Sequence, residues 1–323
     1  MRQGWLLVGL VISSGVAFFW PDDWWSPLVA SKPWLGGLIA ATMFAVGCLL
    51  PVDEIRNVGK KWPLVLAGTA LQYTVMPTTA YLVARAFEFD SGTLAGMVLV
   101  GCVPGAMASN VLTLLARGNT SYSVCLTTLA TLASPVAVPA ALSLALSANH
   151  EIDFLATSWL LVWQVVLPVF AGFLSCRLSR SMQRIMEFAG PLIANLVILW
   201  IIAAVVALNK TRAHELTLSI VLALLLINLI GYLAGYFGGA ALRIDEPMRR
   251  ALTLEVGMQN CGLGTTMALS LFPGTTAAIP TAVYTFGCML TGAMLATWWS
   301  RVPTQTRAVS HSSKDSTGDS SIA

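Results

Sequence analysis

The chain has 323 residues, of which 56% are hydrophobic and only 10% are charged. An average soluble domain carries about 25% charged residues. Eighteen Lys and Arg and fifteen Asp and Glu side chains cannot cover a soluble globule of this length, which argues against soluble enzymes, nucleic-acid-binding proteins and disordered proteins. The composition is that of a protein in a lipid bilayer.

The apolar residues are grouped in segments long enough to cross a membrane, which takes about 20 residues per helix. Ten such segments follow one another, at residues 5–20, 33–50, 62–87, 93–116, 121–146, 154–176, 188–208, 216–242, 251–272 and 277–300. The first is short, but it ends in Phe18-Phe19-Trp20-Pro21, which offers no small-residue cleavage site, so we expect a membrane helix and not a signal peptide. The sequence predicts an all-α polytopic membrane protein with ten transmembrane helices.

The basic residues test this count, because Lys and Arg accumulate on the cytoplasmic side of a membrane protein. With ten crossings, both termini and the alternate loops share one side, and 14 of the 18 basic residues fall there: Arg2, Arg56, Lys60, Lys61, Arg117, Arg177, Arg180, Arg184, Arg243, Arg249, Arg250, Arg301, Arg307 and Lys314. Both termini are therefore predicted to be cytoplasmic. The polar, Ser-rich residues 303–323 predict a disordered cytoplasmic tail.

Glu255 is the single charged residue deep inside a predicted membrane segment. An ionised carboxylate at this depth costs at least about 2.5 kcal/mol, so it needs a partner. Since no Lys or Arg lies within the hydrophobic cores, that partner is predicted to be a bound cation or a proton. The structural alternative is a protonated side chain that is hydrogen-bonded to a neighbouring helix.

Two predicted segments contain residues that interrupt helices. Pro104 and Gly105 lie in the fourth segment, and Gly257 and Gly262 lie in the ninth. Taken alone, each pattern is typical of a simple kink or of close helix packing. However, the segments are fourth of the first five and fourth of the second five, and paired interrupted helices indicate a secondary transporter built from two inverted five-helix repeats.

Oxygen-bearing side chains gather around the two interruptions. Ser109 and Asn110 follow the first one, Gln72 lies in the third segment, and Ser123, Thr127 and Thr131 recur every four residues on one face of the fifth. Carboxylate, carbonyl, amide and hydroxyl oxygens are the ligands of small hard cations. By itself the Ser/Thr stripe favours interhelical hydrogen bonds, but beside Glu255 it favours cation coordination.

The chain resembles the bile acid:sodium symporter family over about residues 5–300. The most specific segments are Gly101-Cys-Val-Pro-Gly-Ala-Met-Ala-Ser-Asn-Val111 with Leu115-Ala-Arg-Gly-Asn119, and Glu255-Val-Gly-Met-Gln-Asn260. The resemblance implies that helices 4 and 9 cross and that two co-transported Na⁺ ions bind behind the crossing. The first ion would use Ser109, Asn110, Ser123, Thr127 and Glu255; the second would use Gln72, Glu255, Val256, Met258 and Gln259.

The resemblance also implies two domains. A panel domain would comprise residues 1–50 and 151–213, and a core domain would comprise residues 51–150 and 214–302, with residues 303–323 as the tail. A substrate cavity between the two domains would open alternately to each side. We expect a monomer in the inner membrane of a bacterium, with the lipid bilayer and an organic anion as partners and without nucleic acid.

The predicted substrate positions, Met107, Asn260, Cys288 and Met289, match the family less well. Bile-acid-binding bacterial members have Thr at the place of Met107 and Trp-His-Asn at the place of Gly287-Cys288-Met289. A small carboxylate such as pantoate or a keto acid is therefore the substrate hypothesis, beside a bile-acid-like anion. A proton-coupled transporter that uses Glu255 is the alternative. A passive channel is disfavoured because no filter sequence repeats, and a membrane-embedded enzyme because no catalytic dyad is present.

Overall fold

The computed structural model describes residues 2–21, 25–50, 52–146, 152–210 and 215–302, and every regular element within these ranges is a helix. The predicted tail at residues 303–323 lies outside the described residues. The first half of the chain forms α1 (Arg2–Phe19), α2 (Pro27–Ala30), η1 (Lys32–Trp34), α3 (Leu35–Cys48), α4 (Val52–Ala86), α5 (Ser91–Cys102), α6 (Ala108–Leu115) and α7 (Thr120–Leu146).

The second half forms α8 (Phe154–Leu161), the π-helical turn η2 (Val162–Val166), α9 (Leu167–Leu178), α10 (Arg180–Leu208), α11 (Leu218–Ala241), α12 (Glu246–Gly257), α13 (Cys261–Leu271) and α14 (Ala278–Arg301). Within the described residues, five helical stretches are long and apolar enough to cross a membrane: α7, the continuous α8–α9, α10, α11 and α14. Each of the ten predicted segments overlaps one helix or a run of consecutive helical elements. How many of them cross the bilayer stays a prediction.

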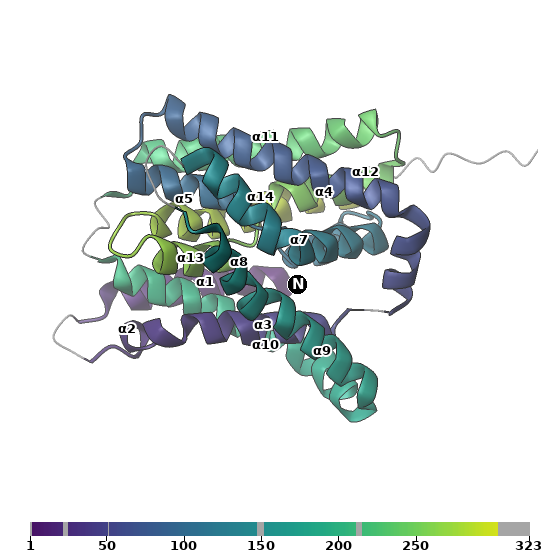
Figure 1. Ribbon diagram of the computed structural model, residues 1–323, viewed down its shortest axis with the longest axis horizontal. Coiled ribbons are helices and arrows are strands. Elements are labelled where there is room, and N and C mark those ends of the chain that lie inside the picture. The colour runs from purple at the N-terminus through teal and green to yellow at the C-terminus, as the bar shows by residue number, and fades with distance from the viewer. Residues whose placement is uncertain (1, 22–24, 51, 147–151, 211–214, 303–323) are drawn as a thin grey trace, which may run out of the picture.

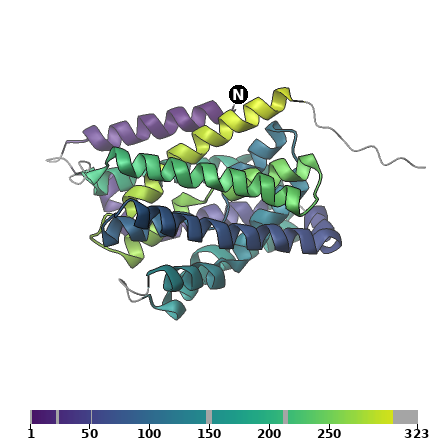
Figure 2. The ribbon, with the colours of Figure 1, turned by 90° about the horizontal axis from the view of Figure 1, so that it is seen from above.

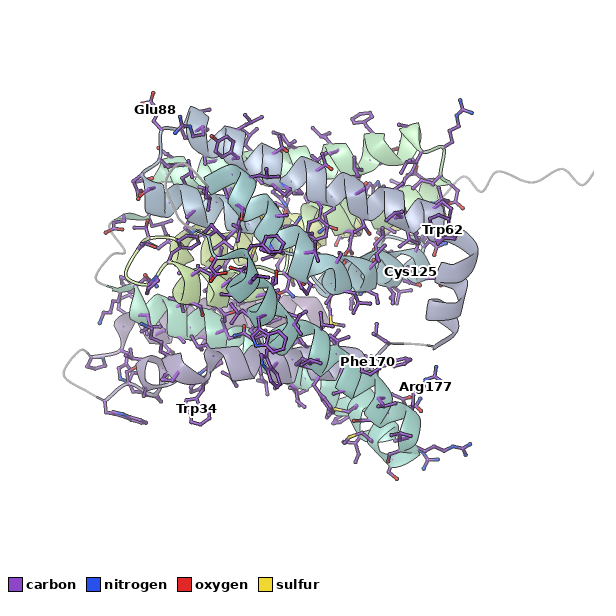
Figure 3. All side chains as sticks on the ribbon, in the orientation of Figure 1. Trp34, Trp62, Glu88, Cys125, Phe170 and Arg177 are labelled. Atoms are coloured by element: carbon purple, nitrogen blue, oxygen red, sulfur yellow. The ribbon has the colours of Figure 1, made fainter. Side chains whose placement is uncertain are left out.

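The helices form two groups. In Figure 1, α4 and α11 run along one side, with α5, α7, α12 and α14 beside them, whereas α1, α3 and α10 run along the other side. The packing pairs agree, since α4 contacts α5, α7 and α11, and α10 contacts α1 and α3. Figure 2 shows α11 and α4 side by side, and α1 next to α14, where the two groups meet. The helix α9 leaves the body of the molecule obliquely and ends near Arg177 (Figure 3).

The outer surface is apolar. Trp34 is 73% and Trp62 is 58% exposed, and both project from the outside of the molecule (Figure 3). Leu144, Leu155 and Phe188 are each at least 78% exposed. A water-soluble monomer does not expose apolar side chains on this scale, so the helices are those of a multi-pass membrane protein.

Three helices begin five or more residues before the predicted segments. α4 begins at Val52, α10 at Arg180 and α12 at Glu246, because Glu, Arg and Lys are good helix formers. Hydropathy identifies the apolar part of a helix, which can lie in the hydrocarbon of the bilayer. It does not identify the residue at which the helix begins. One consequence concerns Arg250, which was expected in a loop but lies in α12 and is 1% exposed.

The buried Arg250 ties three helix ends together. Its guanidinium donates to the carbonyl oxygens of Ala116 (2.9 Å) and Trp299 (3.2 Å), and it pairs with Glu246 at 3.2 Å. These carbonyls lie at the C-terminal ends of α6 and α14, where helices leave acceptors without an intrahelical donor. Arg250 therefore holds the start of α12 in place through backbone atoms of two other helices.

The turns that lead into the two interrupted helices are alike. Glu88 follows α4 with a φ of 55°, and Arg243 follows α11 with a φ of 56°. Asp90 then caps α5 and Asp245 caps α12, and both capped helices are 12 residues long. The chain thus enters α5 and α12 by the same local structure.

The Asp90 cap has a measurable effect on stability. Its carboxylate accepts hydrogen bonds from the backbone N–H groups of Gly92 (2.9 Å) and Thr93 (3.2 Å). Burial opposes ionisation, but hydrogen bonds from Thr93, Gly92 and Thr276 outweigh it and hold the pKa of Asp90 below its usual value. We expect Asp90→Ala to lower the free energy of unfolding by about 1 kcal/mol at pH 7.

Because the pKa of Asp90 is lower in the folded state, its stabilisation is complete above the unfolded value of about 3.9 and disappears as the pH falls through the folded value. Melting temperatures of the wild type and Asp90→Ala should therefore differ at pH 7 and converge below about pH 3.9. Asp90→Asn, which keeps a capping oxygen, is the control. Equal melting temperatures of the wild type and Asp90→Ala at pH 7 would contradict the prediction.

Candidate functional site

Both interrupted helices break in the middle, and the two breaks pair with each other. α5 ends at Cys102 and α6 begins at Ala108; α12 ends at Gly257 and α13 begins at Cys261. The N–H of Ala106 donates to the carbonyl of Met258 (2.8 Å), and the N–H of Asn260 donates to the carbonyl of Pro104 (2.8 Å). Gly105 and Gln259 form the antiparallel bridge between these two bonds. The breaks therefore satisfy part of their own freed backbone, as burial in a membrane protein requires.

Position 105 has no room for a side chain while Glu255 keeps its place. A Cβ atom there would collide with the carboxylate of Glu255. Gly257 is in a comparable position, because a Cβ there would collide with the ring of Tyr232. Gly262, which was expected to belong to the second break, lies in the first turn of α13 and has room for a Cβ.

Glu255 is completely buried and lies next to the first break. Its Oε2 accepts hydrogen bonds from Ser109 Oγ (2.7 Å) and Thr127 Oγ1 (2.8 Å), whereas its Oε1 has no hydrogen-bond partner among the described residues. The Asn110 side-chain oxygen lies 3.3 Å from Thr127 Oγ1. Side chains from α6, α7 and α12 thus meet at one carboxylate, half of which is unsatisfied.

The fifth predicted member of this group, Ser123, lies one helical turn from Thr127 on α7. Its backbone oxygen lies 3.0 Å from Thr127 Oγ1, and its Oγ accepts from Thr113 Oγ1 at 3.2 Å. The Ser123 hydroxyl is therefore engaged by Thr113, and the link from Ser123 to the Glu255 carboxylate runs from its backbone carbonyl through Thr127. Thr131, the last member of the Ser/Thr stripe, is buried, and its carbonyl accepts from Ser134 Oγ at 2.8 Å.

The second predicted group lies at the other break. Gln72 Nε2 donates to Gln259 Oε1 (3.2 Å), and Gln259 Nε2 donates to the carbonyl of Val256 (2.9 Å). Gln72 and Gln259 are 1% and 2% exposed, and Gln72 Oε1 has no hydrogen-bond partner among the described residues. The carbonyl of Met258, the remaining member, accepts from Ala106 in the paired breaks. A second unsatisfied oxygen is therefore buried in this group.

The four predicted substrate positions have different surroundings. Met107 and Asn260 are the N-cap residues of α6 and α13, and both are half-buried. Asn260 also uses its side-chain oxygen to accept from the N–H of Leu263 (3.3 Å). Cys288 and Met289 are only 1% and 7% exposed. The structure therefore leaves Met107 and Asn260 accessible and buries the two residues of α14.

Two residues at the second break are not among the sequence-predicted positions. Asn228 of α11 and Tyr284 of α14 both donate to the carbonyl of Gly257, at 2.8 Å and 2.9 Å. Asn228 carries a signal in the sequence, since it is an amide inside the apolar segment 216–242. Nothing in the sequence distinguishes Tyr284 from other aromatic residues of a membrane helix.

The chemistry of this arrangement suits a small cation. A buried carboxylate with one unsatisfied oxygen, an unsatisfied amide oxygen, hydroxyl groups and backbone carbonyls form a donor set made only of oxygen atoms. Hard monovalent and divalent cations prefer such ligands. Glu255 is the single acidic residue among the positions predicted for the two groups.

Comparisons with known proteins agree with the resemblance. A sequence model described as the Sodium Bile acid symporter family matches residues 37–216. An uncharacterized sodium-dependent transporter of Bacillus subtilis, YocS, is 37% identical over 273 residues, which cover 84% of each chain. A probable sodium/metabolite cotransporter of Arabidopsis thaliana chloroplasts is 30% identical over 266 residues, which cover 81% of this chain and 66% of that protein.

Human sodium/bile acid cotransporter 4 is 26% identical over 246 residues, which cover 74% of this chain and 56% of that protein. The chain therefore spans most of the Bacillus protein and about two thirds or less of the plant and human proteins. The matched family and these relatives are transporters and not enzymes.

Proposed function

Since the chain belongs to the sodium bile acid symporter family, we propose that it is a sodium-coupled symporter of an organic anion that works by alternating access. The observation that carries the proposal is the Glu255 carboxylate, which is buried with Oε1 unsatisfied beside two broken helices. A bound cation supplies the positive charge that this carboxylate lacks. The names of the bacterial and plant relatives, which refer to sodium, favour Na⁺ as that cation.

Two Na⁺ ions are proposed as co-substrates. The first is held by Glu255 with the polar side chains of α6 and α7, namely Ser109, Asn110, Ser123 and Thr127. The second is held by Glu255, Gln72, Gln259 and the carbonyl oxygens of Val256 and Met258. Support for the second site comes from Gln72 Oε1, which is buried without a partner among the described residues, and from the Gln259 amide, which a cation can displace from the Val256 carbonyl.

The proposed architecture has ten membrane-crossing helices in two inverted five-helix repeats. The matching turns before α5 and α12, their equal lengths and the antiparallel pairing of their breaks support the repeat. α1, α3 and α8–α10 form the proposed panel domain, and α4–α7 and α11–α14 form the core domain. We propose a monomer in the inner membrane of a bacterium with both termini cytoplasmic; the asymmetry of the basic residues supports the orientation of the termini.

Coupling follows from the proposed position of the ions behind the crossing of the two interrupted helices. Cations that bind Glu255 hold α12 against α6 and α7, and so set the positions of the N-terminal ends of α6 and α13. Exposed N–H groups at helix N-termini favour anions. By linkage, an anion that binds there raises the affinity for Na⁺ by the same factor by which Na⁺ raises the affinity for the anion.

The proposed substrate is a small carboxylate. Met107 and Asn260, at the starts of α6 and α13, are the accessible residues next to the breaks. Neither provides a charged group, so the carboxylate of the substrate is expected to be held by backbone N–H groups. A thermal-shift screen of organic acids with Na⁺ present identifies the substrate class.

The coupling ion is tested by melting temperatures of the purified protein at constant ionic strength. Na⁺ in place of K⁺ is expected to raise the melting temperature, because a ligand that binds only the folded state adds about 2.7 kcal/mol at 100 times its Kd. Repeating the titration between pH 6 and pH 8 separates Na⁺ from a proton on Glu255. A melting temperature that does not change with the Na⁺ concentration but changes with pH would establish proton coupling instead.

A further inference from the structure

The carbonyl oxygen of Gly257 is freed by the second break and is captured by two other helices. In a continuous helix it would accept from the N–H of residue 261. Instead, the N–H of Cys261 donates to the carbonyl of Gln259 (2.8 Å). The carbonyl of Gly257 accepts from Asn228 Nδ2 (2.8 Å) and from the Tyr284 hydroxyl (2.9 Å). Asn228 and Tyr284 are 3% and 1% exposed. Two buried donors therefore hold one backbone oxygen.

Further contacts hold these donors. Thr291 Oγ1 donates to Asn228 Oδ1 (2.8 Å), which directs the Nδ2 end of the amide towards Gly257. The Tyr232 hydroxyl lies 3.1 Å from Thr291 Oγ1, and the Tyr232 ring lies against Gly257, where it leaves no room for a Cβ. Hydrogen bonds among buried polar groups restrict the conformation of the groups that make them. The peptide after Gly257 is thus fixed from the sides of α11 and α14.

The neighbours of Gly257 in the chain belong to the proposed cation site. Val256 and Met258 present carbonyl oxygens, which accept from Gln259 Nε2 and from the N–H of Ala106. Glu255 is two residues before Gly257. Because these carbonyls belong to successive peptide units, the direction of the Gly257 carbonyl restricts the directions of the other two.

We propose that Asn228 and Tyr284 are positioning residues for cation binding. They hold the Gly257 carbonyl and thereby keep the backbone of the second break in the conformation that presents Glu255 and the carbonyls of Val256 and Met258 to the ion. Neither side chain contacts the cation itself. The inference rests on the proposed function, since it assumes that Glu255 binds Na⁺.

Tyr284→Phe tests the proposal, because it removes one hydroxyl and keeps the ring that fills the space between α12 and α14. The Na⁺ concentration that gives half of the sodium-dependent rise in melting temperature is expected to increase about three- to tenfold, the effect of losing one hydrogen bond to a buried acceptor. Asn228→Leu, which removes the other donor at similar volume, is expected to shift it in the same direction. If one of the two variants fails to fold, the half-saturating Na⁺ concentration of the other variant tests the proposal.

Tyr122→Phe is the matched control. Tyr122 is 4% exposed, and its hydroxyl donates to the carbonyl of Leu64 at 2.9 Å, so the same bond is lost at another place in the same group of helices. This variant is expected to melt at a lower temperature without Na⁺ and to keep the wild-type half-saturating concentration. A purely structural role of Tyr284 would give the same result as Tyr122→Phe.

The outcomes separate the inference from the proposed function. A wild-type protein that responds to Na⁺, together with Tyr284→Phe and Asn228→Leu variants that keep its half-saturating concentration, would overturn the inference alone. A wild-type protein without a sodium response would overturn the proposed function, and the inference with it. A raised half-saturating concentration in either donor variant, with the control unchanged, supports the inference.

Discussion

Glu255→Gln is expected to remove the sodium-dependent rise in melting temperature and to weaken Na⁺ binding by at least about 100-fold, which corresponds to about 2.7 kcal/mol. Glutamine has nearly the same size, but it replaces one oxygen by an amide group and removes the negative charge that both proposed ions share. Ser109 and Thr127 can still donate to the remaining oxygen, so the local fold should persist. Sodium titrations of melting temperature and uptake into proteoliposomes measure both effects.

In K⁺ without Na⁺, Glu255→Gln should melt at the same temperature as the wild type or higher, because it removes an uncompensated buried charge. An unchanged or higher melting temperature distinguishes a cation site from a carboxylate that stabilises the fold, because loss of a stabilising carboxylate would lower the melting temperature. Glu246→Gln is the control, since Glu246 pairs with Arg249 and Arg250 away from the site and its loss should leave the half-saturating Na⁺ concentration unchanged. Retention of the sodium response in Glu255→Gln would exclude Glu255 as a ligand.

Gly105→Ala is expected to lower the free energy of unfolding by about 1–3 kcal/mol and to abolish sodium binding. The added Cβ would collide with the Glu255 carboxylate. The backbone cannot easily move away, because Gly105 is paired with Gln259 and the flanking residues are hydrogen-bonded to the second break. Melting temperature and sodium titration of the purified variant test the two effects separately.

Gly262→Ala is the matched control for this substitution. At Gly262 the nearest atoms to an added Cβ would be 3.7 Å and 4.0 Å away, and the residue is helical. We expect a change between zero and about 1 kcal/mol of stabilisation, because alanine restricts the unfolded chain more than glycine does. If the Gly105→Ala and Gly262→Ala variants bound Na⁺ with the same affinity, the close approach of Gly105 to the Glu255 carboxylate would have no role in the site.

Much of the fold follows from the sequence, because hydropathy and helix-breaking residues are local properties. The apolar segments predict all the long helices, and Pro104 and Gly105 lie where α5 gives way to α6. The lone acidic residue in a membrane segment, Glu255, identifies the centre of the candidate site, since a buried charge has few explanations. The resemblance carried by residues 101–111 and 255–260 indicates the family that the comparisons confirm.

Only the tertiary structure shows which residues meet. The pairing of Ala106 with Met258, the burial of Arg250 among helix ends and the capture of the Gly257 carbonyl by Asn228 and Tyr284 depend on contacts between segments up to 152 residues apart. Hydropathy describes how one segment partitions into the bilayer, whereas these contacts depend on how several helices pack. The sequence by itself therefore determined the apolar helices and the acidic residue at the centre of the candidate site, and the packing decided which oxygen atoms surround that residue.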